Sequence, residues 1–247
     1  MSKDVEFLID LVKQASLLIT DDIYIKAKGE EGDLVTNFDY EIEEYMIKKI
    51  KSSYPNFQII SEELNENEKL TENCFTIDPI DGTKNFANDI PMWGIQVACI
   101  RDGKTCAAVI YLPKLNELYY ADKSGAYRNG EIIKVNQYSY EKGMYTVTAK
   151  EPIIGISKMR KINRNNCNYC AAVNFAYVAC GRLSGSIYRA ESLWDYIPGQ
   201  YLVKQAGGII YNGEGAHIAA NNKKFLEILK ENASYEKSEK IIITNEG

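Results

Sequence analysis

Nine consecutive residues, Asp78-Pro-Ile-Asp-Gly-Thr-Lys-Asn-Phe86, constrain this chain more than any other stretch. An apolar β-type run, Cys74–Ile77, leads into them and delivers two carboxylates, Asp78 and Asp81. The proline between the carboxylates removes a backbone donor, and Gly82 permits a tight turn before a threonine hydroxyl. Asp-Pro and Asp-Gly pairs alone are common in surface turns. The complete string is instead typical of a hard-cation site beside a phosphate-binding loop.

The bulk composition is that of a globular protein, and its net charge bears on which partners the chain can bind. The chain has 247 residues, which suffices for one large domain or two closely packed lobes. Its hydrophobic fraction of 45% and charged fraction of 26% are ordinary. The net charge of -5 weighs against binding a nucleic-acid polymer, and an anionic substrate would need local cations, metal ions included.

The cysteines and the single histidine favour structural roles. Several of the six cysteines lie in apolar runs, such as Val97–Ile100, which predicts buried free thiols. Cys167 and Cys170 have the spacing of a redox or zinc pair, but no second pair exists and His217 is the only histidine. The first residues lack the features of a signal peptide, and no apolar run approaches membrane-spanning length. We therefore expect a cytoplasmic protein that does not contact a membrane.

The first part of the chain combines helices with antiparallel strands. Apolar residues at helical spacing predict a helix over residues 3–20. The same spacing predicts a second helix that begins at Thr36 or Asn37 and ends at a break at Tyr54. The polar segment 25–33 between the two helices is predicted to be a loop. A turn at Arg101–Lys104 predicts a hairpin. The predicted strands are 57–60, 74–77, 96–100, 105–110, 118–120 and 126–127.

The last third alternates between strands and helices, which together with the first part indicates a layered two-lobe sandwich. The predicted strands are 144–149, 153–156, 185–188, 208–211 and 240–244. The predicted helices are 171–180, 194–206 and 222–230.

Five acidic residues stand at the ends of these elements and indicate a single cleft. They are Asp39, Glu62, Asp78, Asp81 and Asp195. Magnesium prefers oxygen ligands in near-octahedral geometry, and one or two protein carboxylates per ion suffice. Each acid alone also has an ordinary structural explanation. Asp39 and Asp195, for example, suit the start of a helix because a negative charge is stabilising there.

Four motifs in order resemble the inositol monophosphatase family of magnesium-dependent, lithium-sensitive phosphomonoesterases, and the match covers nearly the whole chain. The motifs are Asp33–Asp39, Ser61–Glu63, Asp78–Phe86 and Trp194–Gly208. The strand residues Ile218–Asn221 also fit the family.

The resemblance implies a fold, an assembly and a cofactor. The implied fold is an α+β layered αβαβα sandwich of the inositol monophosphatase and fructose-1,6-bisphosphatase type. Residues 1–140 would form an N-terminal lobe with the antiparallel sheet and residues 141–247 a C-terminal α/β lobe, joined as one catalytic unit. A homodimer is implied, with two or three Mg²⁺ per site, Mn²⁺ as a possible replacement and Li⁺ as an inhibitor.

The family's metal and catalytic roles carry over residue by residue. Glu62, Asp78 and the Ile80 carbonyl would hold the first ion. Asp78, Asp81 and Asp195 would hold the second. Glu62 and, through water, Asp39 would hold a weaker third. Thr83 and Glu62 would position and help deprotonate the attacking water.

Substrate contacts carry over less directly. The resemblance implies that the Gly82 and Thr83 amides bind phosphate and that Lys28 lies on a loop near the metals. It also places Cys170 and Ala171 beside the substrate. Tyr169-Cys170 stands where the family commonly has Gly-Ser or Gly-Thr.

Departures from the family pattern leave the substrate open. Arg189 falls near the family's inositol-binding glutamate and favours a second phosphate or another anion over a neutral polyol. Ile197-Pro198 is bulkier than the family's alanines, and Pro198 is expected in the first turn of the helix, where proline is tolerated. Inositol 1-phosphate is the default substrate. Fructose 1,6-bisphosphate and a 3′(2′),5′-bisphosphate nucleotide are alternatives, and a catalytically weak phosphate-binding or interaction protein is a further one.

Overall fold

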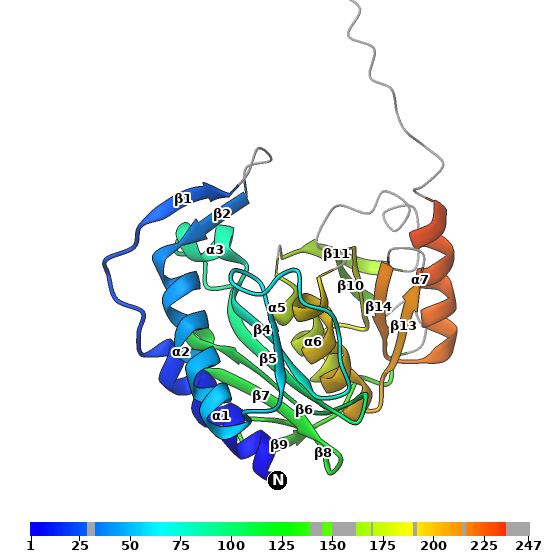
Figure 1. Cartoon of the computed structure of the whole chain (residues 1–247). Helices are drawn as coiled ribbons and strands as arrows, with labels where there is room; N and C mark the ends of the chain where they lie inside the picture. Colours follow the sequence, from blue (N-terminus) through cyan, green and yellow to red (C-terminus); the bar gives the residue numbers. More distant parts are fainter. Residues whose placement is uncertain are drawn as a thin grey trace, which may run out of the picture.

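The computed structural model arranges the chain in five layers of alternating helices and sheets (Figure 1). It describes residues 1–28, 33–138, 145–149, 162–168, 170–189, 192–213 and 216–235. In the order of the layers, α1 and α2 are followed by a seven-stranded sheet, α5 and α6, a five-stranded sheet and α7. The predicted αβαβα layering is confirmed.

The seven-stranded sheet is antiparallel except for the pairing of its edge strand β3 with β4, which is parallel. The predicted hairpin joins β5 to β6, with Asp102 and Gly103 in the left-handed conformation. A short 3-10 helix, η1 (Pro113–Leu115), precedes β7. In sheet order the strands are β3 (Gln58–Ser61), β4 (Cys74–Asp81), β5 (Gly94–Arg101), β6 (Lys104–Leu112), β7 (Glu117–Asp122), β8 (Gly125–Arg128) and β9 (Glu131–Ile133).

Side chains alternate along the strands, so apolar residues lie on both faces of this sheet. Val97 and Cys99 of β5 pack with α1 (Lys3–Ser16) and α2 (Asn37–Ser53). Ala98 and Ile100, which lie between and beyond them, pack on the opposite face with Trp194 of α6 (Leu193–Gln205). Because successive side chains of a strand point to opposite faces, one apolar run serves two helical layers.

The five-stranded sheet mixes parallel and antiparallel pairs. Its order is β11 (Ile162–Cys167), β10 (Tyr145–Ala149), β12 (Gly185–Tyr188), β14 (Ala216–Ala220) and β13 (Ile209–Gly213), and the first three strands are parallel.

Helices cover both faces of this second sheet. Ala219 of β14 packs toward α6 and α5 (Ala171–Ala179), whereas Ile218 and Ala220 pack against α7 (Lys223–Tyr235). The layer of α5 and α6 therefore lies between the two sheets.

Several predicted elements need correction. The first helix ends at Ser16, four residues earlier than predicted. Residues 25–28 are not loop, because β1 (Ile25–Lys28) pairs with β2 (Asp33–Thr36) as an antiparallel hairpin. The short helix α3 (Thr83–Ala87) and strand β11 were not predicted.

The predicted strands 153–156 and 240–244 lie outside the described residues. Within the described part of the chain, no helix has both the length and the apolar character needed to cross a membrane.

Candidate active site

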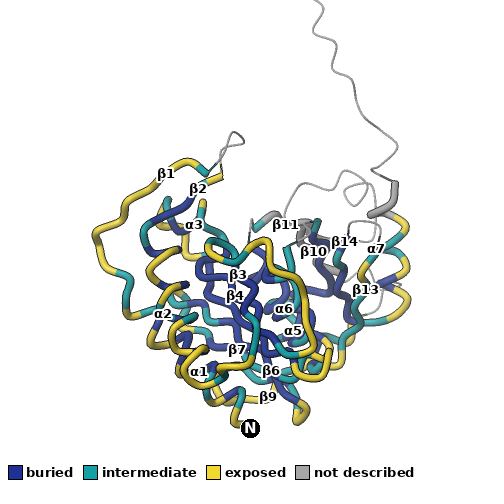
Figure 2. The backbone as a smooth tube through the Cα atoms, viewed as in Figure 1, coloured by how far each residue is buried: buried dark blue, intermediate teal, exposed yellow. Residues whose placement is uncertain are grey.

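The end of β4 carries two carboxylates into the interior of the protein. All eight residues of β4 are buried, and Figure 2 shows this strand within the dark-blue centre. Asp78 pairs with Gln96 and Asp81 with Gly94 of β5, so the ladder has an irregularity between them. Such irregularities re-aim side chains next to functional sites.

A third carboxylate, Asp195 in the first turn of α6, completes a compact cluster. One carboxylate oxygen from each of Asp78, Asp81 and Asp195 lies within 4.8 Å of the other two. The cluster lines a cleft of about 240 Å³. The other residues lining the cleft are Lys28, Asp33, Leu34, Glu62, Ile80, Gly82, Thr83, Lys84, Tyr188, Ser192 and Trp194.

Burial and mutual repulsion disfavour the ionised forms of these acids. Burial raises the pKa of Asp81 to about 7, and the charge of Asp195 adds to the effect. Burial raises the pKa values of Asp78 and Glu62 well above the usual range, with the neighbouring carboxylates as further causes. Bound cations would remove this penalty, because an opposite charge favours the ionised form.

The donor set fits a hard divalent cation. Oδ1 of Asp78 is buried and has no hydrogen-bond partner within the described structure. Its Oδ2 receives only a long contact of 3.3 Å from the Gln96 side-chain amide. An unsatisfied buried carboxylate oxygen is costly, and coordination of Mg²⁺ by carboxylate and carbonyl oxygens would satisfy it.

Glu62 is brought to the cleft by β3 and by a buried acid on α2. Glu43 of α2 accepts hydrogen bonds from the Ser61 hydroxyl at 2.5 Å and from the Glu63 and Leu64 amides at 2.9 and 2.8 Å. Lys28 donates to Glu63 at 2.8 Å and lies 3.8 Å from Glu62. The strand-end turn is therefore held from both sides.

Asp39 is fully buried at the start of α2. Its Oδ2 accepts from the Thr36 amide and hydroxyl at 2.7 and 2.6 Å, which forms a capping box at the start of α2. Its Oδ1 is buried and has no partner in the described part of the chain. Burial raises the pKa of Asp39 to about 6, and its charge in turn raises the pKa of Glu62. Asp39 is not among the described residues that line the cleft.

Gly82 and Thr83 form the turn that follows Asp81. Gly82 has a φ of +87°, and a Cβ there would lie 3.1 Å from the Met92 carbonyl oxygen and 3.2 Å from Cβ of Cys170. Glycine is therefore required both by conformation and by space. The Thr83 hydroxyl donates to the Ile80 carbonyl at 3.0 Å.

Cys170 and Ala171 contact Asp81. The Cys170 thiol lies 3.3 Å from Oδ2 of Asp81, and the Ala172 amide donates to the same oxygen. The start of α5 therefore holds Asp81 in place. Both Cys170 and Ala171 are buried, and neither is among the described residues lining the cleft; Arg189 is not among them either.

Sequence reasoning missed three residues that position the acids, namely Glu43, Gln96 and Tyr188. The Tyr188 hydroxyl donates to Oδ2 of Asp195 at 2.5 Å. Gln96 contacts Asp78 and Asp81 at 3.3 and 3.4 Å. Glu43 and Gln96 had a signal, since each is a polar residue at a core-facing position of an otherwise apolar face. Tyr188 had none, because a tyrosine ending an apolar strand is ordinary.

The altered Trp-Asp motif also differs from expectation in its geometry. Because α6 begins at Leu193, Pro198 is the sixth helical residue and not in the first turn. Pro198 is buried, and Ile197 packs against the apolar cluster around Trp194. The helix continues to Gln205 despite the missing amide.

Comparisons with known proteins agree with this architecture. The model of the inositol monophosphatase family matches residues 1–243. A Thermotoga maritima protein named fructose-1,6-bisphosphatase/inositol-1-monophosphatase is 33% identical over 209 residues, which cover 82% of this chain and 80% of that protein. Nus factor SuhB of Escherichia coli strain K12 is 32% identical over 238 residues, with 89% of each chain covered.

A solved structure, that of a Thermotoga maritima IMPase, superposes with a TM-score of 0.86 at 26% identity. It covers 96% of this chain and 99% of that one. The fold, the ordered motifs and these similarities show that the chain belongs to the inositol monophosphatase family.

Proposed function

We propose that this protein is a Mg²⁺-dependent phosphomonoesterase that hydrolyses a small phosphate ester with an activated water, and that inositol 1-phosphate is its default substrate. Membership of a phosphatase family supports a phosphoric monoester hydrolase. The observation that carries the proposal is the convergence of Asp78, Asp81 and Asp195 within 4.8 Å in one cleft.

The proposed metal ligands are those that the family resemblance implies, and the cluster of three aspartates supports one of the sets. Asp78, Asp81 and Asp195 would hold one ion, and Glu62, Asp78 and the Ile80 carbonyl a second. Glu62 and Asp39 would contribute to a weaker third site. When bound, Mg²⁺ supplies positive charge that neutralises the phosphate and lowers the pKa of water. Mn²⁺ would replace Mg²⁺ at these positions, because it also prefers oxygen ligands.

The chain's own groups would bind and orient the reactants. The Thr83 hydroxyl directs its proton to the Ile80 carbonyl, since a carbonyl only accepts, so the lone pairs of Thr83 can accept a hydrogen bond from the attacking water. Burial and the neighbouring carboxylates raise the pKa of Glu62, so it accepts a proton more readily than an ordinary glutamate, as a general base must. The backbone amides of Gly82 and Thr83, two residues that line the cleft, would bind phosphate oxygens.

Phosphate release from a panel of esters tests the proposal. We expect Mg²⁺-dependent turnover of inositol 1-phosphate that chelation abolishes and Li⁺ inhibits. Asp81→Asn should reduce the rate to background, whereas the control Asp89→Asn, at an exposed ion pair with Lys114, should retain it. No Mg²⁺-dependent turnover of any ester in the panel would refute the phosphatase and favour the phosphate-binding or interaction protein.

A bisphosphate substrate is the second candidate, favoured by the lysines of the cleft. Lys28 and Lys84 both line it, and Lys84 is half exposed and 3.3 Å from the exposed Asp33. A second phosphate could replace this weak surface ion pair. The panel therefore includes fructose 1,6-bisphosphate and phosphoadenosine phosphate.

Lys84→Ala distinguishes the candidates, with Lys114→Ala as the matched control. If the substrate is a bisphosphate, Lys84→Ala should lower kcat/KM for it about tenfold more than for inositol 1-phosphate. An equal effect on both would argue against the second candidate. The homodimer is part of the proposal, and light scattering on the purified protein tests it.

A further inference from the structure

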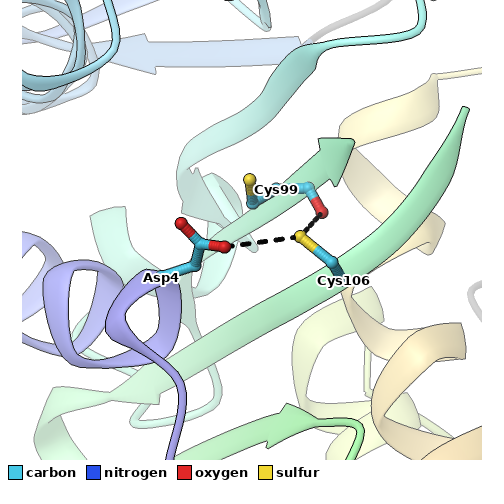
Figure 3. A group of neighbouring side chains, drawn as sticks. All are labelled: Asp4, Cys99 and Cys106. Carbon is cyan, nitrogen blue, oxygen red and sulfur yellow. Dashed lines mark hydrogen bonds between the residues drawn. The ribbon is translucent and has the colours of Figure 1, made fainter. Parts of the chain in front are cut away.

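A second group of side chains that could bind a metal lies on the face of the seven-stranded sheet that packs against α1. It consists of Asp4 in the first turn of α1, Cys99 of β5 and Cys106 of β6 (Figure 3). One ligand atom from each, a carboxylate oxygen and two Sγ atoms, lies within 4.8 Å of the other two. None of these residues lines the proposed active-site cleft.

A β-bulge brings the two thiols to the same face. Cys99 pairs with Ala107 and Ile100 with Thr105, so Cys106 is the extra residue. In a regular ladder Cys106 and Ala107 would point to opposite faces. Because a bulge re-aims the extra side chain, Cys106 packs beside Cys99 in the cluster under α1. Its Sγ lies 3.5 Å from the Cys99 carbonyl and 3.7 Å from Oδ2 of Asp4.

The carboxylate of Asp4 is oriented by groups behind it. The Tyr54 hydroxyl donates to Oδ1 at 2.8 Å, and Arg101 approaches Oδ1 at 3.1 Å and Oδ2 at 3.4 Å. The guanidinium of Arg101 also packs on the ring of Phe57, with a centroid distance of 4.9 Å. Oδ2 is left facing the thiols. Outer hydrogen bonds of this kind fix the direction of a ligating carboxylate.

Ligand chemistry and charge both select a thiophilic divalent cation. Thiolates favour Zn²⁺ over the hard cations that carboxylate oxygens bind. Two thiolates, one carboxylate, one Arg101 and one divalent cation sum to zero charge, which suits a partly buried position. A tetrahedral Zn²⁺ site places its sulfur and oxygen ligands about 3.5–3.8 Å apart, and the 3.7 Å between Cys106 and Asp4 matches this.

We propose that Asp4, Cys99 and Cys106 bind one cation of the Zn²⁺ class at a site separate from the carboxylate cleft. The cation joins α1 to the bulge between β5 and β6. Asp4 and Cys106 are only partly buried, so the cation can enter from solvent and water can occupy the fourth position. Cation binding at this site does not depend on catalytic activity, so it is independent of the proposed phosphatase reaction.

Cobalt substitution of the full chain tests this site. Protein treated with chelator and reductant is titrated with Co²⁺, and the near-ultraviolet absorption from thiolate-to-cobalt charge transfer is recorded. We expect a band that saturates at one Co²⁺ per chain and that Zn²⁺ displaces. Cys106→Ser should abolish the band, and Asp4→Asn should weaken Co²⁺ binding about tenfold or more.

Matched variants separate this site from the active-site cleft. Cys170→Ser removes the thiol beside Asp81, and Asp81→Asn disables the cleft; both should keep the band. In the Asp81→Asn background, where the cleft is disabled, Zn²⁺ should raise the unfolding midpoint, and adding Cys106→Ser to that variant should remove the rise. Circular dichroism of the metal-free variants establishes that they are folded.

Several outcomes would overturn the proposal. One is the absence of a thiolate band in the wild type, and another is a band that survives Cys106→Ser. Loss of the band in Cys170→Ser would move the cation to the cleft. A mass lower by two hydrogens, mapped to a Cys99–Cys106 disulfide that resists the reductant, would replace the metal site with a covalent bond.

Discussion

Replacing Asp81 by asparagine should stabilise the metal-free protein while removing its activity. The buried carboxylate repels its neighbours when no cation is present, and the amide carries no charge. The shape is nearly preserved, since an amide oxygen can still accept the hydrogen bond from the Ala172 amide. The same substitution therefore measures how much the buried charge lowers the free energy of unfolding, separately from its role in activity.

The size of the effect follows from the pKa of Asp81, whose ordinary value of 3.8 burial raises to about 7. A difference of one in pKa corresponds to about 1.4 kcal/mol, so ionised Asp81 costs the metal-free fold up to about 4 kcal/mol. Because the folded-state pKa is raised, the wild type loses this stability as the pH rises from about 4 to about 7. The variant should therefore exceed the wild type by about 2–4 kcal/mol at pH 8 and by little at pH 4.

Thermal unfolding of chelated protein at both pH values measures this difference. For a chain of this length, 1 kcal/mol shifts the midpoint by about 2–4 °C, so the variant should unfold at least about 4 °C higher at pH 8. Added Mg²⁺ should raise the wild-type midpoint more than that of the variant, which lacks one ligand of one of the two proposed ions.

Two results would refute the electrostatic reasoning. One is a chelated variant that is no more stable than the wild type at pH 8. The other is a gain of the same size at pH 4, where Asp81 is protonated in the folded state and the repulsion is absent.

Three further predictions concern residues that position the acids. Tyr188→Phe removes the donor to Asp195 and should raise the Mg²⁺ concentration for half-maximal activity about tenfold, measured by titrating the ion in the phosphate-release assay. Glu43→Ala leaves three donors without their acceptor and should cost about 3 kcal/mol in urea unfolding, together with most of the activity because Glu62 loses its support. Cys170→Ala removes the side-chain cap of α5 and should cost about 1 kcal/mol in the same unfolding assay.

Conservative substitutions serve as controls for these predictions. Tyr196→Phe, at a tyrosine stacked on His217, should leave the Mg²⁺ requirement unchanged. Glu43→Gln should recover part of the stability that Glu43→Ala loses, since an amide oxygen still accepts, and Cys170→Ser should keep the cap. A Tyr188→Phe enzyme with an unaltered Mg²⁺ requirement, or Glu43→Ala with wild-type stability, would contradict the assigned roles.

The local elements were largely predictable because their signals are local. The apolar spacing of α2 and its Thr36–Asp39 cap predict a helix that the structure contains. The turn at Arg101–Lys104 predicts the hairpin of β5 and β6 in the same way. The Ile25–Lys28 strand was missed, since it is mostly exposed and its pattern comes from pairing with β2 and not from burial.

The family and the chemical types of the site residues could be inferred from the sequence alone. Two carboxylates, a turn glycine and a hydroxyl after a buried strand could be read directly, because these residues are adjacent in the chain. The motif order then placed Glu62 and Asp195 in the same cleft. Both line it in the structure.

The contacts that support these groups become visible only in the folded structure. Glu43 holds the turn of Glu62, Tyr188 holds Asp195, and the start of α5 holds Asp81 from 91 residues away. The bulge that turns Cys106 toward Asp4 likewise leaves no mark in the local sequence. Such contacts join segments that meet only when the layers pack. Their geometry therefore depends on registers and helix positions that no short pattern encodes.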